Sequence, residues 1–183
     1  MDKRKIFIIT GTREGGKTQF INDLFDFLSL FEKKIAGFLS RGSFNDQGQK
    51  DFILRNLKNG NEIHLASRNE LEGYEQRGNF FFNTNAINAG NKIIEDALIE
   101  KEKIIILDEI GPLELSGKVW HDSFLRILNN HKGILIFSTR KRMMDRIIEN
   151  YKIHEAFIED IELTSPRKTG NSIISLMKQM QDF

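Results

Sequence analysis

The sequence predicts an α/β fold, in which helices cover both faces of a mostly parallel sheet. Three observations lead to this prediction. Continuous apolar runs typical of buried strands occur at residues 5–10, 104–107 and 133–139. Segments with apolar residues at helical spacing alternate with these runs. A glycine-rich segment, residues 11–18, directly follows the first run and opens the first helical segment, which gives the order strand, tight turn, helix.

The first helix is predicted over residues 17–31. Its apolar residues recur at helical spacing and form one face, which consists of Phe20, Ile21, Leu24, Phe25, Leu28 and Phe31. A strand is expected next at residues 34–39, followed by a turn at residues 42–49, where glycine, serine, asparagine and aspartate gather.

Residues 35–82 predict an antiparallel β meander inserted after the first strand and helix. Strands are expected at residues 51–54 and 62–66, and Asn59-Gly60-Asn61 between them is a strong hairpin signal. Three consecutive phenylalanines at residues 80–82 indicate another short strand.

The rest of the chain returns to alternation between strands and helices. Further helices are predicted at residues 84–100, 119–130 and 170–181, with a basic helix or lid at 140–150 and a strand near 155–163.

Bulk properties favour one globular domain over residues 1–183 of the chain. Hydrophobic residues make up 39% and charged residues 29%, which indicates a folded core rather than disorder. The formal net charge of +1 gives no general attraction to nucleic acid or membranes. Basic segments without interleaved aromatic residues argue against nucleic acid as a partner, and the sequence leaves any protein partner unknown.

Cysteine and histidine usage excludes several classes of site. The chain has no cysteine, so it can have neither disulfides nor thiolate metal sites. Its four histidines lack the spacing of metal ligands. No apolar stretch approaches the length of a membrane span, and we expect a cytoplasmic enzyme.

Residues 11–18 read Gly-Thr-Arg-Glu-Gly-Gly-Lys-Thr, the G-x-x-x-x-G-K-T pattern of a P-loop, or Walker A motif. Glycines let backbone N–H groups wrap closely around phosphates, and the helix that follows turns its positive end toward the same charge. Lys17 would reach the β- and γ-phosphates, and the Thr18 hydroxyl would coordinate Mg²⁺. The nucleotide-binding residues predicted from this motif are Gly11, Thr12, Arg13, Glu14, Gly15, Gly16, Lys17, Thr18 and Gln19.

A charged pair inside this loop is unusual. A carboxylate at Glu14 would repel phosphate, so we expect Arg13 and Glu14 to form an ion pair that faces solvent.

Residues 104–109 fit the Walker B pattern, in which a buried strand ends in a carboxylate. Ligands of open α/β sheets bind at the carboxyl ends of strands. Asp108 is therefore predicted to hold Mg²⁺ together with Thr18, directly or through water, and Glu109 to act as the general base on the attacking water.

The continuation of this motif carries a narrower resemblance. Residues 108–115 read D-E-I-G-P-L-E-L, which resembles the D-E-I-G-x-M-E-L signature of the thermophile-type and cancer-related nucleoside-triphosphatase family. Residues 37–40 and Leu65-Ala66 resemble further segments of that family in order and place. The resemblance implies a three-layer P-loop NTPase fold of the RecA-type, additional-strand class. It also implies slow, Mg²⁺-dependent hydrolysis of ATP, GTP and other nucleoside triphosphates.

Several positions depart from the family pattern. Glu14 replaces a usual glycine, Asp51-Phe52 stands for a G-F pair, and residues 164–167 lack the asparagine of a late N-R-D element. Leu113 replaces methionine, which is a conservative change. Glu114 matches the glutamate of the family pattern. Its role is either to form a structural ion pair or to take part in catalysis, as equal alternatives.

Negative charge that develops on the γ-phosphate during the reaction requires a further positively charged group to neutralise it. Arg140 is the first candidate for this arginine finger, while Arg41 and Arg77 also lie near predicted strand ends. The alternative is that the basic run from residue 140 is simply a solvated helix face. Ser138 and Thr139 either sense the γ-phosphate or merely end a strand.

Three functions are compatible with these motifs. The first is a nucleoside-triphosphate hydrolase. The second is a small-molecule or nucleotide kinase that holds its acceptor against the meander, and the third is a nucleotide-dependent switch with little turnover.

Overall fold

The computed structural model describes residues 4–12, 15–44, 48 and 50–181. Its strands are β1 (Lys5–Gly11), β2 (Ile35–Phe44), β3 (Lys50–Asn56), β4 (Glu62–Ser67), β5 (Tyr74–Arg77), β6 (Phe80–Asn83), β7 (Ile104–Leu107), β8 (Ile134–Arg140) and β9 (Phe157–Asp160). Its α-helices are α1 (Lys17–Leu28), α2 (Thr84–Ile99), α3 (Pro112–Leu115), α4 (His121–Asn130), α5 (Met144–Asn150) and α6 (Pro166–Gln181), and a 3-10 turn, η1 (Lys141–Met143), precedes α5.

All these strands belong to one sheet in the order β5-β6-β4-β3-β2-β7-β8-β1-β9. The half from β2 to β9 is parallel, whereas β3, β4, β6 and β5 extend the sheet in antiparallel pairs. The prediction of a mostly parallel sheet is therefore wrong for the sheet as a whole. The predicted antiparallel meander is confirmed, and it pairs with the free edge of β2, so it lengthens the same sheet.

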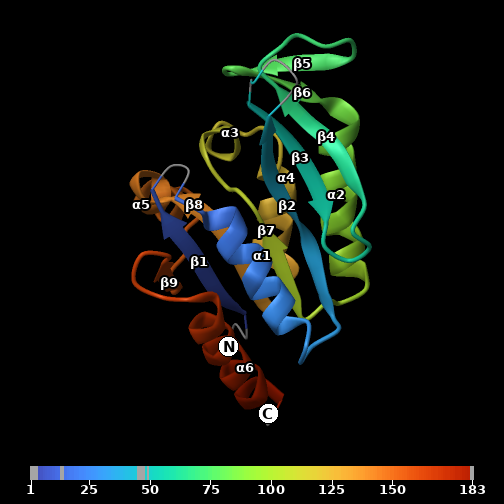
Figure 1. Ribbon diagram of the computed structural model, residues 1–183. Helices are drawn as coiled ribbons and strands as arrows, with labels where there is room; N and C mark the ends of the chain where they lie inside the picture. Colours follow the sequence, from blue (N-terminus) through green and yellow to red (C-terminus); the bar gives the residue numbers. More distant parts are fainter. Residues whose placement is uncertain (1–3, 13–14, 45–47, 49, 182–183) are drawn as a thin grey trace.

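Both faces of the sheet are buried at β1, β7 and β8, as the continuous apolar runs predicted. Neighbouring residues of β1 point to opposite faces. Ile6 and Ile8 pack in one core with α2, α4 and α5, and Phe7 and Ile9 pack in the other with α1 and α6. In Figure 1, α1 lies across one face of the sheet, β5 and β6 lie at one end of the molecule, and α6 lies at the opposite end. The result is three layers, helix, sheet and helix.

The predicted elements are confirmed in type, with shifted boundaries. β2 runs on to Phe44, through the first residues of the predicted turn, because it pairs with β3 as far as Lys50. The rest of that predicted turn, residues 45–47 and 49, lies outside the described residues. α1 ends at Leu28 rather than at residue 31, which leaves Phe31 61% exposed. α6 begins four residues early, at Pro166, where Ser165 Oγ accepts the backbone N–H of Lys168 at 3.3 Å.

The strand register brings the sequence motifs to one edge of the sheet. Gly11 at the end of β1 lies beside Arg140 at the end of β8, and Leu107 at the end of β7 lies between Phe38 of β2 and Phe137 of β8. Strand β8 thus separates the strand before the glycine loop from the strand before Asp108.

Candidate functional site

The glycine loop closes tightly between β1 and α1. Gly16 takes the position before the helix with φ of +93°, a left-handed conformation that favours glycine. The carbonyl oxygen of Thr12 accepts the backbone N–H of Gly15 at 3.2 Å and the Lys17 ammonium at 2.7 Å. Arg13 and Glu14 lie outside the described residues, so their predicted ion pair stays a prediction.

Lys17 is buried at the start of α1, with 6% of its surface exposed. This burial lowers the pKa of its ammonium group, and the nearby carboxylates of Glu109 and Asp108 oppose the shift. The loop lysine and the two carboxylates that follow β7 are thus close enough to interact electrostatically, as the two motifs together predict.

Asp108 accepts hydrogen bonds from three elements. Its Oδ2 accepts the Thr18 hydroxyl at 2.7 Å and the backbone N–H of Ser40 at 3.3 Å, while its Oδ1 accepts the Ser138 hydroxyl. Burial raises the pKa of Asp108 to about 6, although these hydrogen bonds pull it down. The carboxylate is therefore fixed in position from both sides of β7.

The pair of Thr18 and Asp108 suits a small, hard cation. Mg²⁺ prefers oxygen ligands at about 2.0–2.1 Å in octahedral geometry, so two adjacent ligands lie about 2.9 Å apart. The 2.7 Å between Thr18 Oγ1 and Asp108 Oδ2 is close to that spacing. Within the described ranges, no cluster of three or more His, Asp or Glu side chains forms a richer metal site. An ion held here would need its remaining ligands from phosphate oxygens and water.

Glu109 and Arg140, predicted separately as base and arginine finger, contact each other. Arg140 Nε donates to Glu109 Oε1 at 2.9 Å, and both side chains are partly exposed, at 28% and 29%. One N–H of the guanidinium thus orients the carboxylate, and the exposure leaves both groups accessible to a ligand.

Glu114 is almost fully buried and supports the loop that carries Glu109. Its Oε2 accepts the backbone N–H of Gly111 at 2.8 Å, and its Oε1 accepts that of Trp120 at 3.4 Å. In the described part of the chain its partners are backbone groups and not a cation, so the ion-pair alternative is wrong. By accepting the N–H of Gly111, the Glu114 side chain caps the first turn of α3 and holds the loop at residues 109–111 in place.

The remaining candidate residues are Ser138 and Thr139 of β8 and Arg77 of β5. Ser138 contacts Asp108, whereas the buried hydroxyl of Thr139 has no hydrogen-bond partner within the described ranges. Arg77 lies on β5, at the far edge of the sheet, where it pairs with Glu75 at 2.8 Å. It is therefore not part of this cluster.

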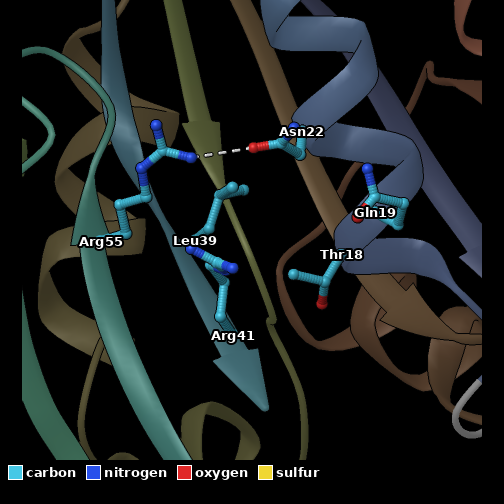
Figure 2. Close-up of a pocket in the computed structure, with 6 residues that line it drawn as sticks. All are labelled: Thr18, Gln19, Asn22, Leu39, Arg41 and Arg55. Carbon is cyan, nitrogen blue, oxygen red and sulfur yellow. Dashed lines mark hydrogen bonds between the residues drawn. The ribbon is translucent and has the colours of Figure 1, made fainter. Parts of the chain in front are cut away.

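A pocket opens beside Thr18, on the side of the meander. Figure 2 shows the side chains that line it, which come from α1 (Thr18, Gln19, Asn22), β2 (Leu39, Arg41) and β3 (Arg55). Gln19, predicted to bind nucleotide, lines this pocket and donates its amide to Asp23 at 2.7 Å. Sequence reasoning missed Asn22 and Arg55, because no motif marks them and only the pairing of β3 with β2 brings Arg55 next to Asn22 of α1.

Comparison with models of known protein families identifies the family of this chain. The family model described as NTPase matches residues 6–168, which is most of the protein. The chain belongs to this NTPase family. The family recognised in the D-E-I-G-P-L-E-L segment is thereby confirmed.

Relatives of this NTPase chain carry a consistent name. A protein of Archaeoglobus fulgidus named nucleoside-triphosphatase THEP1 is 29% identical over 153 residues, which cover 80% of this chain and 86% of the relative. A Thermotoga maritima protein of the same name is 25% identical over 173 residues, covering 93% and 94% of the two chains.

Two solved structures share the fold. THEP1 from Aquifex aeolicus superposes with a TM-score of 0.66 at 22% identity, covering 85% of this chain and 88% of that one. A human cancer-related nucleoside triphosphatase gives a TM-score of 0.66 at 15% identity, covering 97% and 98%. Among the residues described, no helix is long and apolar enough to cross a membrane.

Proposed function

We propose that this NTPase-family protein hydrolyses nucleoside triphosphates to diphosphates and phosphate, with Mg²⁺ and with several bases accepted. The proposal is supported above all by four predicted residues that lie together at one edge of the sheet. They are Lys17, Thr18, Asp108 and Glu109. The motif pair alone predicted these four residues, and the names of the relatives agree with the activity.

Nucleotide binding rests on the glycine loop acting as a P-loop. Backbone N–H groups of residues 11–16, with the amino end of α1, would surround the phosphates. Lys17, which contacts the Thr12 carbonyl in this structure, would transfer its hydrogen bonds to phosphate oxygens. The position of β8 between β1 and β7 supports assignment to the additional-strand, RecA-type class.

Thr18 and Asp108 would hold Mg²⁺, because their oxygens already lie 2.7 Å apart. When bound, the ion supplies positive charge beside the transferring phosphoryl group. Ser40 and Ser138 keep the Asp108 carboxylate in place by their hydrogen bonds.

Glu109 is proposed as the general base. Its carboxylate is partly exposed, stands one residue beyond Asp108, and is oriented by Arg140 through Nε. A water bound by Glu109 would give up a proton to the carboxylate as its oxygen attacks the terminal phosphorus, while the bond from that phosphorus to the bridging oxygen breaks and the nucleoside diphosphate leaves. Among the described residues the other N–H groups of Arg140 have no partner, so they would be available for charge on that phosphate.

Replacement of Glu109 by glutamine tests this assignment. Glu109→Gln keeps the size of the side chain but removes the base, so the hydrolysis rate should fall by roughly 10²–10⁴ while nucleotide binding persists. Phosphate release and fluorescent-nucleotide binding measure the two quantities. Glu95→Gln on the exposed side of α2 is the matched control, with unchanged rate expected. Normal hydrolysis by Glu109→Gln would refute the role of Glu109.

The same assay separates hydrolysis from transfer. A kinase would release little phosphate in water and would speed up when a hydroxyl acceptor is supplied, whereas a hydrolase reaches its full rate without one. A switch would bind nucleotide and release almost no phosphate under either condition.

A further inference from the structure

The pocket beside Thr18 contains two arginines that the proposed hydrolysis does not use. Arg41 enters it from β2 and Arg55 from β3, opposite the first turns of α1 (Figure 2). Thr18 forms the boundary between this pocket and the proposed metal pair.

The charge of Arg55 is not balanced by an acid. Its Nη1 donates to the amide oxygen of Asn22 at 3.1 Å, and within the ranges that the structure describes no carboxylate lies within ion-pair distance of it. A guanidinium group has five N–H donors, so most of those of Arg55 remain to be used. Asn22 is itself oriented, because its amide N–H donates to Asp26 at 3.2 Å.

Arg41 is paired only loosely. Its Nη1 contacts Glu62 Oε1 at 3.0 Å, and the two side chains are 53% and 43% exposed. Exposed pairs of this kind add little to the stability of a protein, so an anion can replace Glu62 as the partner of Arg41. Paired guanidinium groups bind oxyanions through parallel N–H donors.

The small volume of the pocket indicates a small ligand. Its volume is about 140 Å³, which is room for more than a single water molecule. It is well below the roughly 300 Å³ at which pockets for larger organic ligands begin. A phosphate-sized anion fits this volume.

We propose that Arg41 and Arg55 form an oxyanion subsite for a phosphate group that does not belong to the bound nucleotide. The ligand is either the orthophosphate released by hydrolysis or the phosphate of a small phosphomonoester. The proposal rests on the proposed function in one respect, since Thr18 and Gln19, the last predicted nucleotide-binding residues, form one side of this pocket.

The test measures phosphate binding without any nucleotide, so it stands even if hydrolysis fails. Inorganic phosphate is titrated into ¹⁵N-labelled protein carrying Lys17→Ala, which weakens phosphate binding at the glycine loop, and amide shifts of α1, β2 and β3 are followed. We expect saturable shifts in these elements. Arg55→Gln or Arg41→Gln added to Lys17→Ala should weaken the affinity about tenfold or more. Arg126→Gln, an exposed change on α4 across the sheet, should leave it within about twofold.

A second arm uses glycerol 3-phosphate in place of inorganic phosphate. Binding of both supports a pocket open to a second molecule, and binding of inorganic phosphate alone supports a product site. Unchanged phosphate affinity in both arginine variants would overturn the proposal. It would also be overturned if Arg55→Gln weakened ADP binding and left phosphate binding intact, because the guanidinium groups would then belong to the nucleotide.

Discussion

The buried carboxyl of Glu114 makes the stability of this protein depend on pH in a calculable way. Burial raises the pKa of Glu114 from 4.5 to about 7, although backbone N–H groups of Gly111 and Trp120 favour the charged form. This rise in pKa corresponds to roughly 3 kcal/mol of stability, at 1.36 kcal/mol for each tenfold change in the protonation equilibrium. The perturbation we choose is Glu114→Gln, which keeps the shape and cannot ionise.

The direction of the pH dependence follows from whether the folded or the unfolded state holds the proton of Glu114. Below pH 4.5 the carboxyl is protonated in both states and its ionisation contributes nothing. Between pH 4.5 and about 7 the unfolded chain releases a proton that the native protein retains, so the free energy of unfolding falls as pH rises. Above about pH 7 the full loss of about 3 kcal/mol is present. In the Glu114→Gln variant the free energy of unfolding lacks this fall with rising pH.

The assay is urea unfolding at several values between pH 4 and 8, followed by fluorescence of the single tryptophan, Trp120, which is buried beside Glu114. The wild-type stability minus that of Glu114→Gln should fall by about 3 kcal/mol across this range. Exposed Glu95→Gln should differ from wild type by a constant amount. A constant difference for Glu114→Gln as well would refute the burial argument.

Three further predictions address the site and the sheet. Asp108→Asn removes an anionic oxygen beside Thr18, so Mg²⁺ affinity measured by calorimetry should fall about tenfold or more; equal affinity would exclude Asp108 as a ligand. Arg140→Gln frees the Glu109 carboxylate, so kcat should fall about 10²-fold with KM little changed; a changed KM alone would indicate ground-state binding. Gly37→Ala places a Cβ 1.9 Å from the carbonyl oxygen of Ile106, at φ of +135°, and should cost roughly 4 kcal/mol or more in urea unfolding. Gly60→Ala, at φ of +75° with nothing within 4 Å, should cost about 1 kcal/mol, and equal costs would refute the steric argument.

The sequence predicted those features that depend on local pattern. The continuous apolar runs identified β1, β7 and β8, and the two motifs named Lys17, Thr18, Asp108 and Glu109, because glycine spacing and strand-end carboxylates are local signals. The antiparallel strands β3, β4 and β6 followed from turn residues and short apolar runs.

Features that depend on tertiary contacts could not be predicted in the same way. Strand β5 reads Tyr-Glu-Gln-Arg, which carries no apolar pattern and becomes a strand only by pairing with β6. The contact between Arg140 and Glu109 arises because β7 and β8 are neighbours in register. Arg55 reaches Asn22 of α1 through the pairing of β3 with β2, which joins residues 33 positions apart.

The most direct test of the central claim is phosphate release from ATP, GTP, CTP and UTP with Mg²⁺, for wild type and Lys17→Ala. Lys92→Ala, an exposed lysine on α2 paired with Asp96, is the matched control. Our account predicts release from several of the four nucleotides, a loss of roughly 10²-fold or more in Lys17→Ala, and no change in the control. Release at the wild-type rate by Lys17→Ala, or no release from any nucleotide by the wild type, would contradict it.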